Sequence, residues 1–176
     1  MRIGHRIALS AIVLVLAAVA CGGKKEAAAP GAGSTESSPS QAPSSPKAMA
    51  EAIGDIYVEA LTRAVDILKD RPEAAAAKPK IQELKEKTIQ KLVEFGKKKA
   101  SLSASDKAVI DSTLGLRINT VAGTLFSAYQ EAVNYYLSKD TELFNLVGSL
   151  NIITQYADFD LLKKQAPEEA KRLGIE

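Results

Sequence analysis

The sequence has few of the residues from which small proteins build disulfide frameworks and metal sites. Its 176 residues include one Cys, one His and no Trp, and 5% are aromatic. A single Cys cannot close an intramolecular disulfide bond, and a single His cannot provide a His-rich metal site. These absences exclude disulfide-rich scaffolds and zinc modules. Because a domain typically takes about 150 residues, the length leaves room for one domain with appendages and not for two full domains.

The first twenty residues have the profile of a secretory signal peptide. Residues 1–6 carry two Arg and no acidic residue, and residues 7–20 are apolar apart from Ser10. A helix of this apolar run is about 21 Å long, which is short of the roughly 30 Å hydrocarbon core of a bilayer. The run is therefore predicted to be removed with the signal peptide, and not to be a permanent transmembrane helix.

The only Cys follows this run directly, in the order Ala18, Val19, Ala20, Cys21, Gly22. This segment resembles the lipobox of bacterial lipoproteins. The resemblance implies cleavage between Ala20 and Cys21, a diacylglycerol on the Cys21 thiol, and acylation of the new amino group by a fatty acid such as palmitate. Gly22, in place of Asp, implies sorting to the outer membrane. The alternative is an ordinary secretory peptide that is cleaved after Ala20 and leaves Cys21 as a free thiol.

Two or three acyl chains on one residue would hold a protein firmly at a membrane without a spanning helix. The next segment, residues 22–46, consists of Ser, Ala, Gly, Pro, Lys, Glu, Thr and Gln, and it contains no Val, Ile, Leu, Met or aromatic residue. Such a composition cannot bury enough apolar surface to offset its ordering entropy. Residues 21–46 are therefore predicted to be the lipidated Cys21 and a disordered tether, with an end-to-end distance of about 28 Å.

The remaining residues, 47–176, have apolar side chains at helical spacing and show no competing strand pattern. Long helices are predicted at about 47–70, 79–99, 104–138 and 141–157. Pro79 is expected to begin the second helix, Asp140 to cap the fourth, and two short helical turns to follow before Gly174. Four long helices joined by short turns predict an all-α fold, specifically an antiparallel four-helix-bundle-like domain.

The charge pattern does not identify a partner. Lys and Arg number 23 and Asp and Glu 21, and loss of Arg2 and Arg6 with the signal peptide would leave 21 of each. Residues 48–70 hold two basic and five acidic side chains, whereas residues 71–99 hold nine basic and four acidic ones. The second helix either pairs with the acidic first helix or presents a basic face to anionic lipid. Nucleic acid is not expected, because no basic groove with interleaved aromatic residues is present.

The sequence offers little catalytic chemistry. Removal of His5 with the signal peptide would leave no His, which excludes Ser-His and Cys-His dyads, imidazole acid–base catalysis and His-containing metal sites. No glycine-rich phosphate loop, nucleophile elbow or calcium loop is present. The remaining candidates for a carboxylate site are Glu131 near Tyr129, and Asp158 with Asp160, which are equally explained as a solvated helix flank and a helix cap. The prediction is a non-enzyme that binds no metal and no cofactor.

Arg117 falls on the core-facing stripe of the third helix, one turn from Leu114 and Val121. It should therefore reach an acidic residue, with Asp55 and Glu59 of the first helix as candidates. The alternative is an anion contact in a binding groove, because the planar guanidinium group suits carboxylates.

The third and fourth helices are apolar on a second side as well. This second side is predicted either to be covered by the C-terminal tail through Phe159, Leu161 and Leu162, or to contact a ligand, a homodimer partner or another envelope protein. The residues of this face, together with Arg117, are Leu116, Ala122, Gly123, Phe126, Val133, Leu137, Phe144, Gly148, Ile152 and Tyr156.

The sequence thus predicts an outer-membrane lipoprotein that faces the periplasm or the cell surface and displays a non-catalytic helical domain. The first hypothesis for that domain is a structural or protein-interaction role. The alternative is a periplasmic binding module for a lipid or other hydrophobic ligand between the third and fourth helices.

Overall fold

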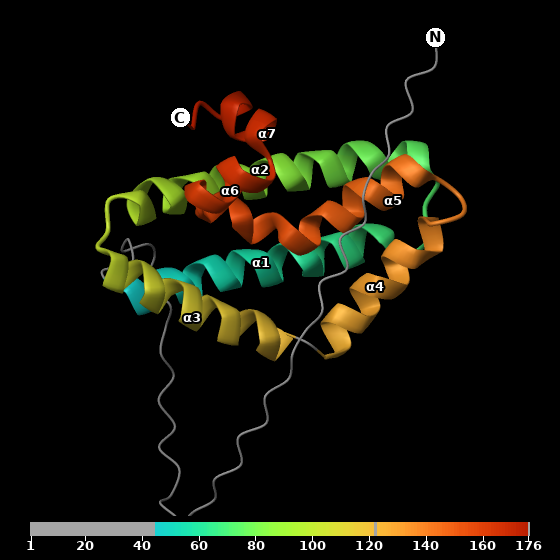
Figure 1. Cartoon of the computed structure of the whole chain (residues 1–176). Helices are drawn as coiled ribbons and strands as arrows, with labels where there is room; N and C mark the ends of the chain where they lie inside the picture. Colours follow the sequence, from blue (N-terminus) through green and yellow to red (C-terminus); the bar gives the residue numbers. More distant parts are fainter. Residues whose placement is uncertain (1–44, 122, 176) are drawn as a thin grey trace, which may run out of the picture. The chain divides into compact units, whose positions relative to one another are not determined.

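The computed structural model describes residues 45–121 and 123–175, which form seven α-helices and one 3₁₀ helix, and no strand occurs within those two ranges (Figure 1). The all-α class predicted from the sequence is confirmed. The elements are α1 (Pro46–Leu68), α2 (Ala74–Ala100), α3 (Ala104–Val121), α4 (Thr124–Tyr136), α5 (Thr141–Gly148), η1 (Ser149–Ala157), α6 (Phe159–Gln165) and α7 (Pro167–Arg172).

Helix α1 begins and ends within two residues of its predicted bounds. Ser45 caps it, accepting a hydrogen bond from the backbone N–H of Ala48 (3.2 Å), and Pro46 occupies the first turn, where its missing N–H costs nothing. One face of α1, including Ile53, Leu61 and Leu68, is buried in the core.

Helix α2 begins five residues earlier than predicted, and Pro79 lies inside it. The prediction that Pro79 starts this helix is wrong. Ala74–Ala77 form the first turn, because alanine has the highest helix propensity and Ala77 is buried (1% exposed). Their helix propensity and packing offset the single helical hydrogen bond that Pro79 cannot donate.

The predicted third helix, 104–138, is two helices instead. The chain leaves α3 at Val121, and Gly123 (φ 178°, ψ −144°) precedes α4 with its carbonyl accepting from the N–H of Ser127 (3.0 Å). Glycine is a poor helix former, and the neighbouring Thr120, Val121 and Thr124 are β-branched, so a continuous helix is weakest here. Helices α3 and α4 meet at an angle, and both pack against α1 (Figure 1).

The predicted fourth helix, 141–157, also has two parts. Asp140 caps α5 as predicted, accepting from the N–H of Leu143 (2.8 Å), but after Gly148 the chain tightens into the 3₁₀ helix η1. The two short C-terminal helices are confirmed as α6 and α7, and Gly174 ends α7 in the left-handed region (φ 67°).

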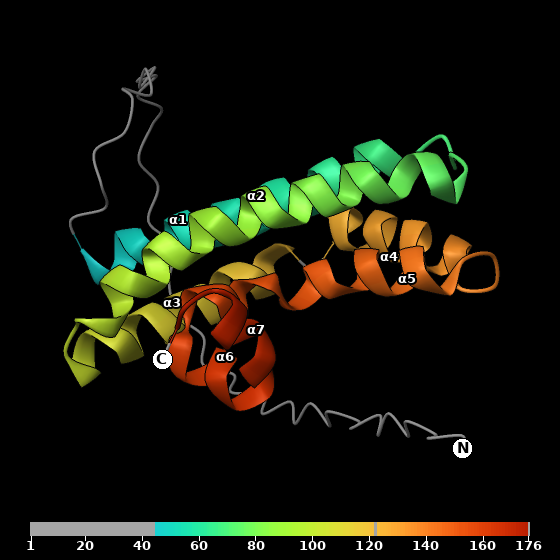
Figure 2. The ribbon, with the colours of Figure 1, turned by 90° about the horizontal axis from the view of Figure 1, so that it is seen from above.

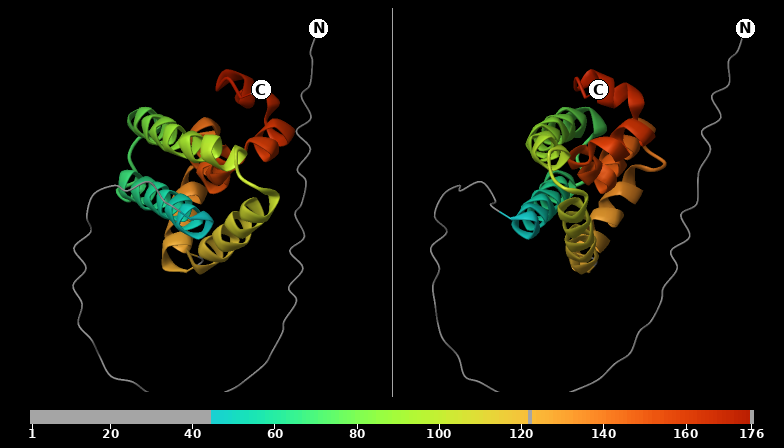
Figure 3. Two further views of the ribbon diagram at one scale, coloured as in Figure 1. Left: turned by 90° about the vertical axis from the view of Figure 1, so that its left-hand side faces the viewer. Right: turned by 60° about the vertical axis from the view of Figure 1, so that its left-hand side comes forward.

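Helices α1 and α2 lie side by side and antiparallel, with α3, α4, α5 and η1 on one side of the pair (Figures 2 and 3). Helix α1 contacts α2, α3, α4 and η1, whereas α2 contacts α5, η1 and α6. The core therefore runs along α1. The finer four-helix-bundle arrangement stays a prediction, because two of its four helices are each split in two.

Candidate functional site

Cys21 and the predicted cleavage position between Ala20 and Cys21 lie outside the described residues, as does the predicted tether up to residue 44. None of the helices from residue 45 onward that the structure describes combines the length and apolar character needed to cross a bilayer. The lipidation site at Cys21, which rests on the most specific motif of the sequence, therefore remains a prediction from sequence.

Arg117 binds Asp55, one of the two acids expected for it, with Nη2 2.8 Å from Oδ1. The second candidate, Glu59, instead accepts from Lys91 (3.1 Å) and Arg63 (2.8 Å). The aliphatic part of Arg117 lies on Gly54 of α1, where an added Cβ would come 2.5 Å from Cγ. The Arg117–Asp55 pair joins α3 to α1 at the margin of the core. It adds little stability, because both side chains are partly exposed to solvent.

The structure does not gather the predicted ligand or partner face on one surface. Val133 and Tyr156 are each 5% exposed and belong to the core, and Phe126 and Phe144 are half-buried.

Leu116, Leu137 and Ile152 of that face are exposed, Leu116 by 69% and the other two by 56% each. The tail covers part of this face, because the Tyr156 hydroxyl donates to Glu169 of α7 and Leu162 is buried (0% exposed), whereas the Phe159 ring packs on Gly96 of α2. The prediction assumed that the third and fourth helices are each continuous. The helix breaks at Gly123, and the chain changes to a 3₁₀ helix after Gly148, so these side chains point in different directions.

The strongest polar feature of the described residues is a buried lysine that sequence reasoning missed. Lys99, in the last turn of α2, has a side chain that is 8% exposed, and its Nζ lies 2.5 Å from Asp111 Oδ1 and 2.6 Å from Asp158 Oδ2. Asp158 also caps α6 by accepting from the N–H of Leu161 (2.9 Å). One ammonium group thus ties together α2, α3 and the η1–α6 junction.

The sequence did carry a signal for this arrangement. Lys99 follows Leu92 by seven residues, so it lies on the buried stripe of α2, whereas Lys97 and Lys98 lie off it. Positive charge is favourable at the end of a helix, which explains the run of three lysines as a whole and does not single out the one that points inward.

Burial and pairing act in opposite directions on the charges of this cluster. Burial by itself would lower the pKa of Lys99, but hydrogen bonds to Asp111 and Asp158 outweigh it and raise the pKa above its ordinary 10.5. Burial would raise the pKa of Asp158, whereas the Lys99 ammonium and the N–H of Leu161 hold it below its ordinary 3.8. The folded chain therefore favours the charged form of both groups.

These shifts set a pH window for the stability that the cluster contributes. The Asp158 contribution to stability is complete above about pH 4 and is lost as pH falls through its lowered folded pKa, whereas the Lys99 contribution is complete below about pH 10 and is lost above it.

We expect the difference in unfolding free energy between wild type and Asp158→Asn to be largest between these limits and to shrink on acidification. Urea unfolding of both proteins at a series of pH values measures it; a difference that stays constant down to pH 2 contradicts it.

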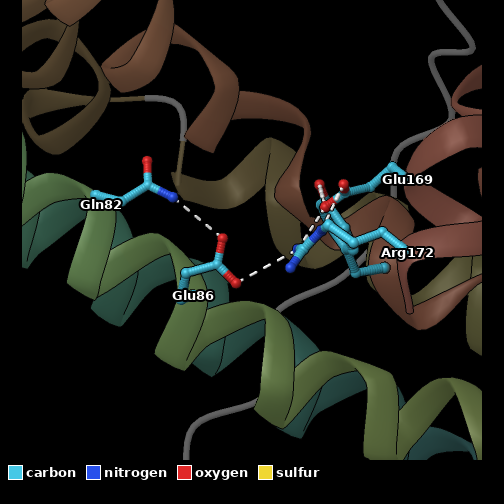
Figure 4. A network of polar contacts seen from close by, with 5 residues as sticks. Gln82, Glu86, Glu169 and Arg172 are labelled. Atoms are coloured by element: carbon cyan, nitrogen blue, oxygen red, sulfur yellow. Dashed lines mark hydrogen bonds and ion pairs between the residues drawn. The ribbon is translucent and has the colours of Figure 1, made fainter. Parts of the chain in front are cut away.

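A second polar cluster attaches helix α7 to α2 (Figure 4). Arg172 binds Glu169 (2.7 Å) on its own helix and Glu86 of α2 (3.3 Å), and Gln82 donates to Glu86 (3.1 Å). The Tyr156 hydroxyl donates to Glu169 (3.0 Å), and its pKa is raised first by burial and then by this carboxylate. The charged groups of this cluster bind one another, so the cluster attaches α7 to α2 and fits a structural role.

Several hollows of the described residues lie beside charged side chains. A groove of about 380 Å³ between α1 and α2 has the half-buried Ile67 and Leu84 in its wall and charged side chains, including Arg63 and Lys87, along its rim. A small cavity of about 90 Å³ adjoins Lys99. Both of these lie away from the apolar face predicted to bind a ligand, whereas a third hollow, of about 480 Å³ between α2 and α7, has Tyr156 of that face in its wall.

Two of the three carboxylates considered for catalysis, Glu131 and Asp158, have structural partners, and Asp160 lies exposed in the first turn of α6. Glu131 is exposed and binds Arg71 (3.2 Å), and Asp158 serves as both a cap and a partner of Lys99. Within the described part of the chain, no cluster of three or more His, Cys, Asp or Glu residues is arranged to hold a metal ion. Glu131 lines a hollow of about 210 Å³ together with Arg71, and Asp158 lines the cavity of about 90 Å³ beside Lys99.

Comparisons of the chain with protein-family models, with curated proteins and with solved structures give no match.

Proposed function

We propose that this chain is a bacterial outer-membrane lipoprotein, anchored through acyl chains on Cys21, whose helical domain has a structural or protein-interaction role. The observation that carries the proposal is the order Ala18, Val19, Ala20, Cys21 directly after the apolar run. The only thiol of the chain stands where lipoprotein maturation would act, and an unpaired Cys in an exported protein otherwise lacks a role.

Two features of the rest of the chain agree with this role. The polar segment after Cys21 has an expected end-to-end distance of about 28 Å, which is long enough to hold a domain clear of the lipid headgroups. The acidic and basic clusters of the described residues bind one another and join helices, so they support a rigid non-catalytic scaffold. The alternative, a hydrophobic ligand between the third and fourth predicted helices, has less support, because Val133 and Tyr156 are part of the core.

Cys21→Ser is expected to abolish incorporation of an alkyne-labelled palmitate and to prevent cleavage before residue 21, because serine offers no thiol for the diacylglycerol. The measurement is expression of wild type and variant in a Gram-negative host, followed by in-gel detection of the label and membrane fractionation with a carbonate wash. Wild type should be labelled and remain with the outer membrane.

Two matched variants complete this experiment. Gly23→Ser changes a residue just beyond the lipobox and should be labelled and retained as wild type is. Gly22→Asp should keep the label but move the protein to the inner membrane, as the resemblance to sorted lipoproteins implies. A Cys21→Ser product that is processed normally and held as firmly in the outer membrane as wild type would overturn the proposal.

A further inference from the structure

Helix α7 buries little apolar surface of its own. Ala170 is its one buried residue (2% exposed), and Leu173 and Ile175, which follow the helix, are half-buried. Among the other helices, α7 packs chiefly on α6. A helix of six residues is marginal in water by itself, so α7 depends on the contacts that dock it.

The contacts that dock α7 on α2 and η1 are polar and partly open to solvent. Arg172 reaches Glu86 of α2 at 3.3 Å (Figure 4). Glu169 accepts from the Tyr156 hydroxyl of η1 (3.0 Å). The side chains of Arg172 and Glu86 are 47% and 37% exposed, whereas that of Lys99 in the buried cluster is 8% exposed. An exposed ion pair of this kind adds little stability and is screened by salt.

Helix α6, in contrast, is anchored by buried groups. Leu162 is 0% exposed, and the Phe159 ring packs on Gly96 of α2. Asp158, which caps α6, also binds the buried Lys99 (2.6 Å). Detachment of α6 therefore requires more free energy than detachment of α7, because regions with few buried apolar contacts open most easily.

The joint between the two helices lets α7 turn without disturbing α6. Ala166 has a non-helical conformation (φ −141°, ψ 64°), and Pro167 disfavours the helical region for the residue before it, so α6 and α7 do not continue into one helix. The space between α2 and α7 is also open, as a hollow of about 480 Å³ with Tyr156, Glu86 and Lys85 in its wall. Separation of α7 from α2 therefore breaks few apolar contacts.

We propose that α7 is a hinged flap that opens about Ala166 while α6 and the longer helices stay folded. The Arg172–Glu86 and Tyr156–Glu169 contacts hold the flap closed. Opening releases the Tyr156 hydroxyl and widens the entrance to the hollow between α2 and α7. Because an exposed ion pair holds it, the flap responds to ionic strength. This device does not depend on anchoring of the chain at a membrane.

Hydrogen exchange of the full-length protein, measured by mass spectrometry, tests the flap. Amides of residues 170–175 should exchange faster than those of α1 and α6, and an increase in NaCl from about 0.05 M to about 0.5 M should accelerate them about two- to fivefold. Arg172→Gln should accelerate them by the same factor at low salt and remove the salt response. Lys171→Gln, which removes an exposed cation from the same helix, is the matched control and should behave as wild type. Exchange of 170–175 no faster than that of α1, or no effect of Arg172→Gln, would overturn the inference.

Thiol labelling locates the hinge. Ala170→Cys and Leu162→Cys each place a thiol at a buried position, the first in α7 and the second in α6. A maleimide should label Ala170→Cys at a rate that rises with salt and should leave Leu162→Cys protected. Wild type provides the correction for Cys21, which reacts alike in all three proteins if it carries no lipid. Protection of both introduced thiols would show that α7 stays docked, and equal labelling of both would show that α6 opens with it; either result contradicts a hinge at Ala166.

Discussion

Lys99→Met is expected to lower the free energy of unfolding by about 2–3 kcal/mol at pH 7, less than the roughly 3–5 kcal/mol cost of breaking a fully buried ion pair, because both aspartates are partly exposed. Methionine matches the length of the lysine stem, so packing is nearly kept while the ammonium group is lost. Asp158, whose side chain is 28% exposed, then keeps a charge with no cation beside it, whereas Asp111 at 55% exposure can turn to water. Urea unfolding followed by circular dichroism measures the difference.

The neighbouring residue provides the control for Lys99→Met. Lys98 is exposed and has the same intrinsic helix propensity, so Lys98→Met should change the stability by less than about 0.5 kcal/mol. The cost of Lys99→Met should also shrink below about pH 4, because protonated Asp158 no longer needs a cation. Equal effects of the two substitutions would show that Lys99 does not act through its ion pairs.

Gly96→Ala is expected to destabilise the chain by a net of about 1–2 kcal/mol, although alanine is the better helix former by about 1 kcal/mol. An added Cβ at residue 96 would collide with the Phe159 ring at Cε1 and come 2.9 Å from Cδ1. The ring is rigid and begins α6, so relief requires α6 to move away from α2. The stability difference is measured by urea unfolding.

A double-mutant cycle separates this collision from other effects of Gly96→Ala. In a Phe159→Ala background the obstacle is absent, so Gly96→Ala should change sign and stabilise by up to about 1 kcal/mol. Gly148→Ala is the matched control, because Gly148 is also helical (φ −54°) and its added Cβ would meet nothing within 4 Å. If Gly96→Ala costs as much without Phe159 as with it, the close approach of α6 is not the cause.

Local signals in the sequence predicted those parts of the fold that depend on neighbours along the chain. Asp140 caps α5 through the N–H of Leu143, and Gly174 ends α7 in a left-handed conformation. Each of these depends on a side chain or backbone group within three or four residues. The Arg117–Asp55 pair was also predicted, because a charge on an apolar stripe must find an opposite charge.

The predictions failed where two conformations were locally close in energy. Pro79 was compatible with starting a helix or lying inside one. It lies inside α2, because Ala77 packs in the core two residues before it. Gly123 was compatible with a continuous helix or a break, and the break allows α3 and α4 to pack on α1 at different angles. The predicted ligand face depended on an unbroken helix there, so its residues separated when the helix divided.

By itself, the sequence determined the all-α class, most helix ends and the lipobox-like segment with the polar stretch that follows it, because each is a property of residues near one another in the chain. Only the tertiary structure decided that Lys99 is the lysine buried between two aspartates and that Leu116 of α3 is exposed. The physical reason is that burial and pairing of charge depend on helices that are distant in sequence, whose packing angles change at the breaks near Gly123 and Gly148.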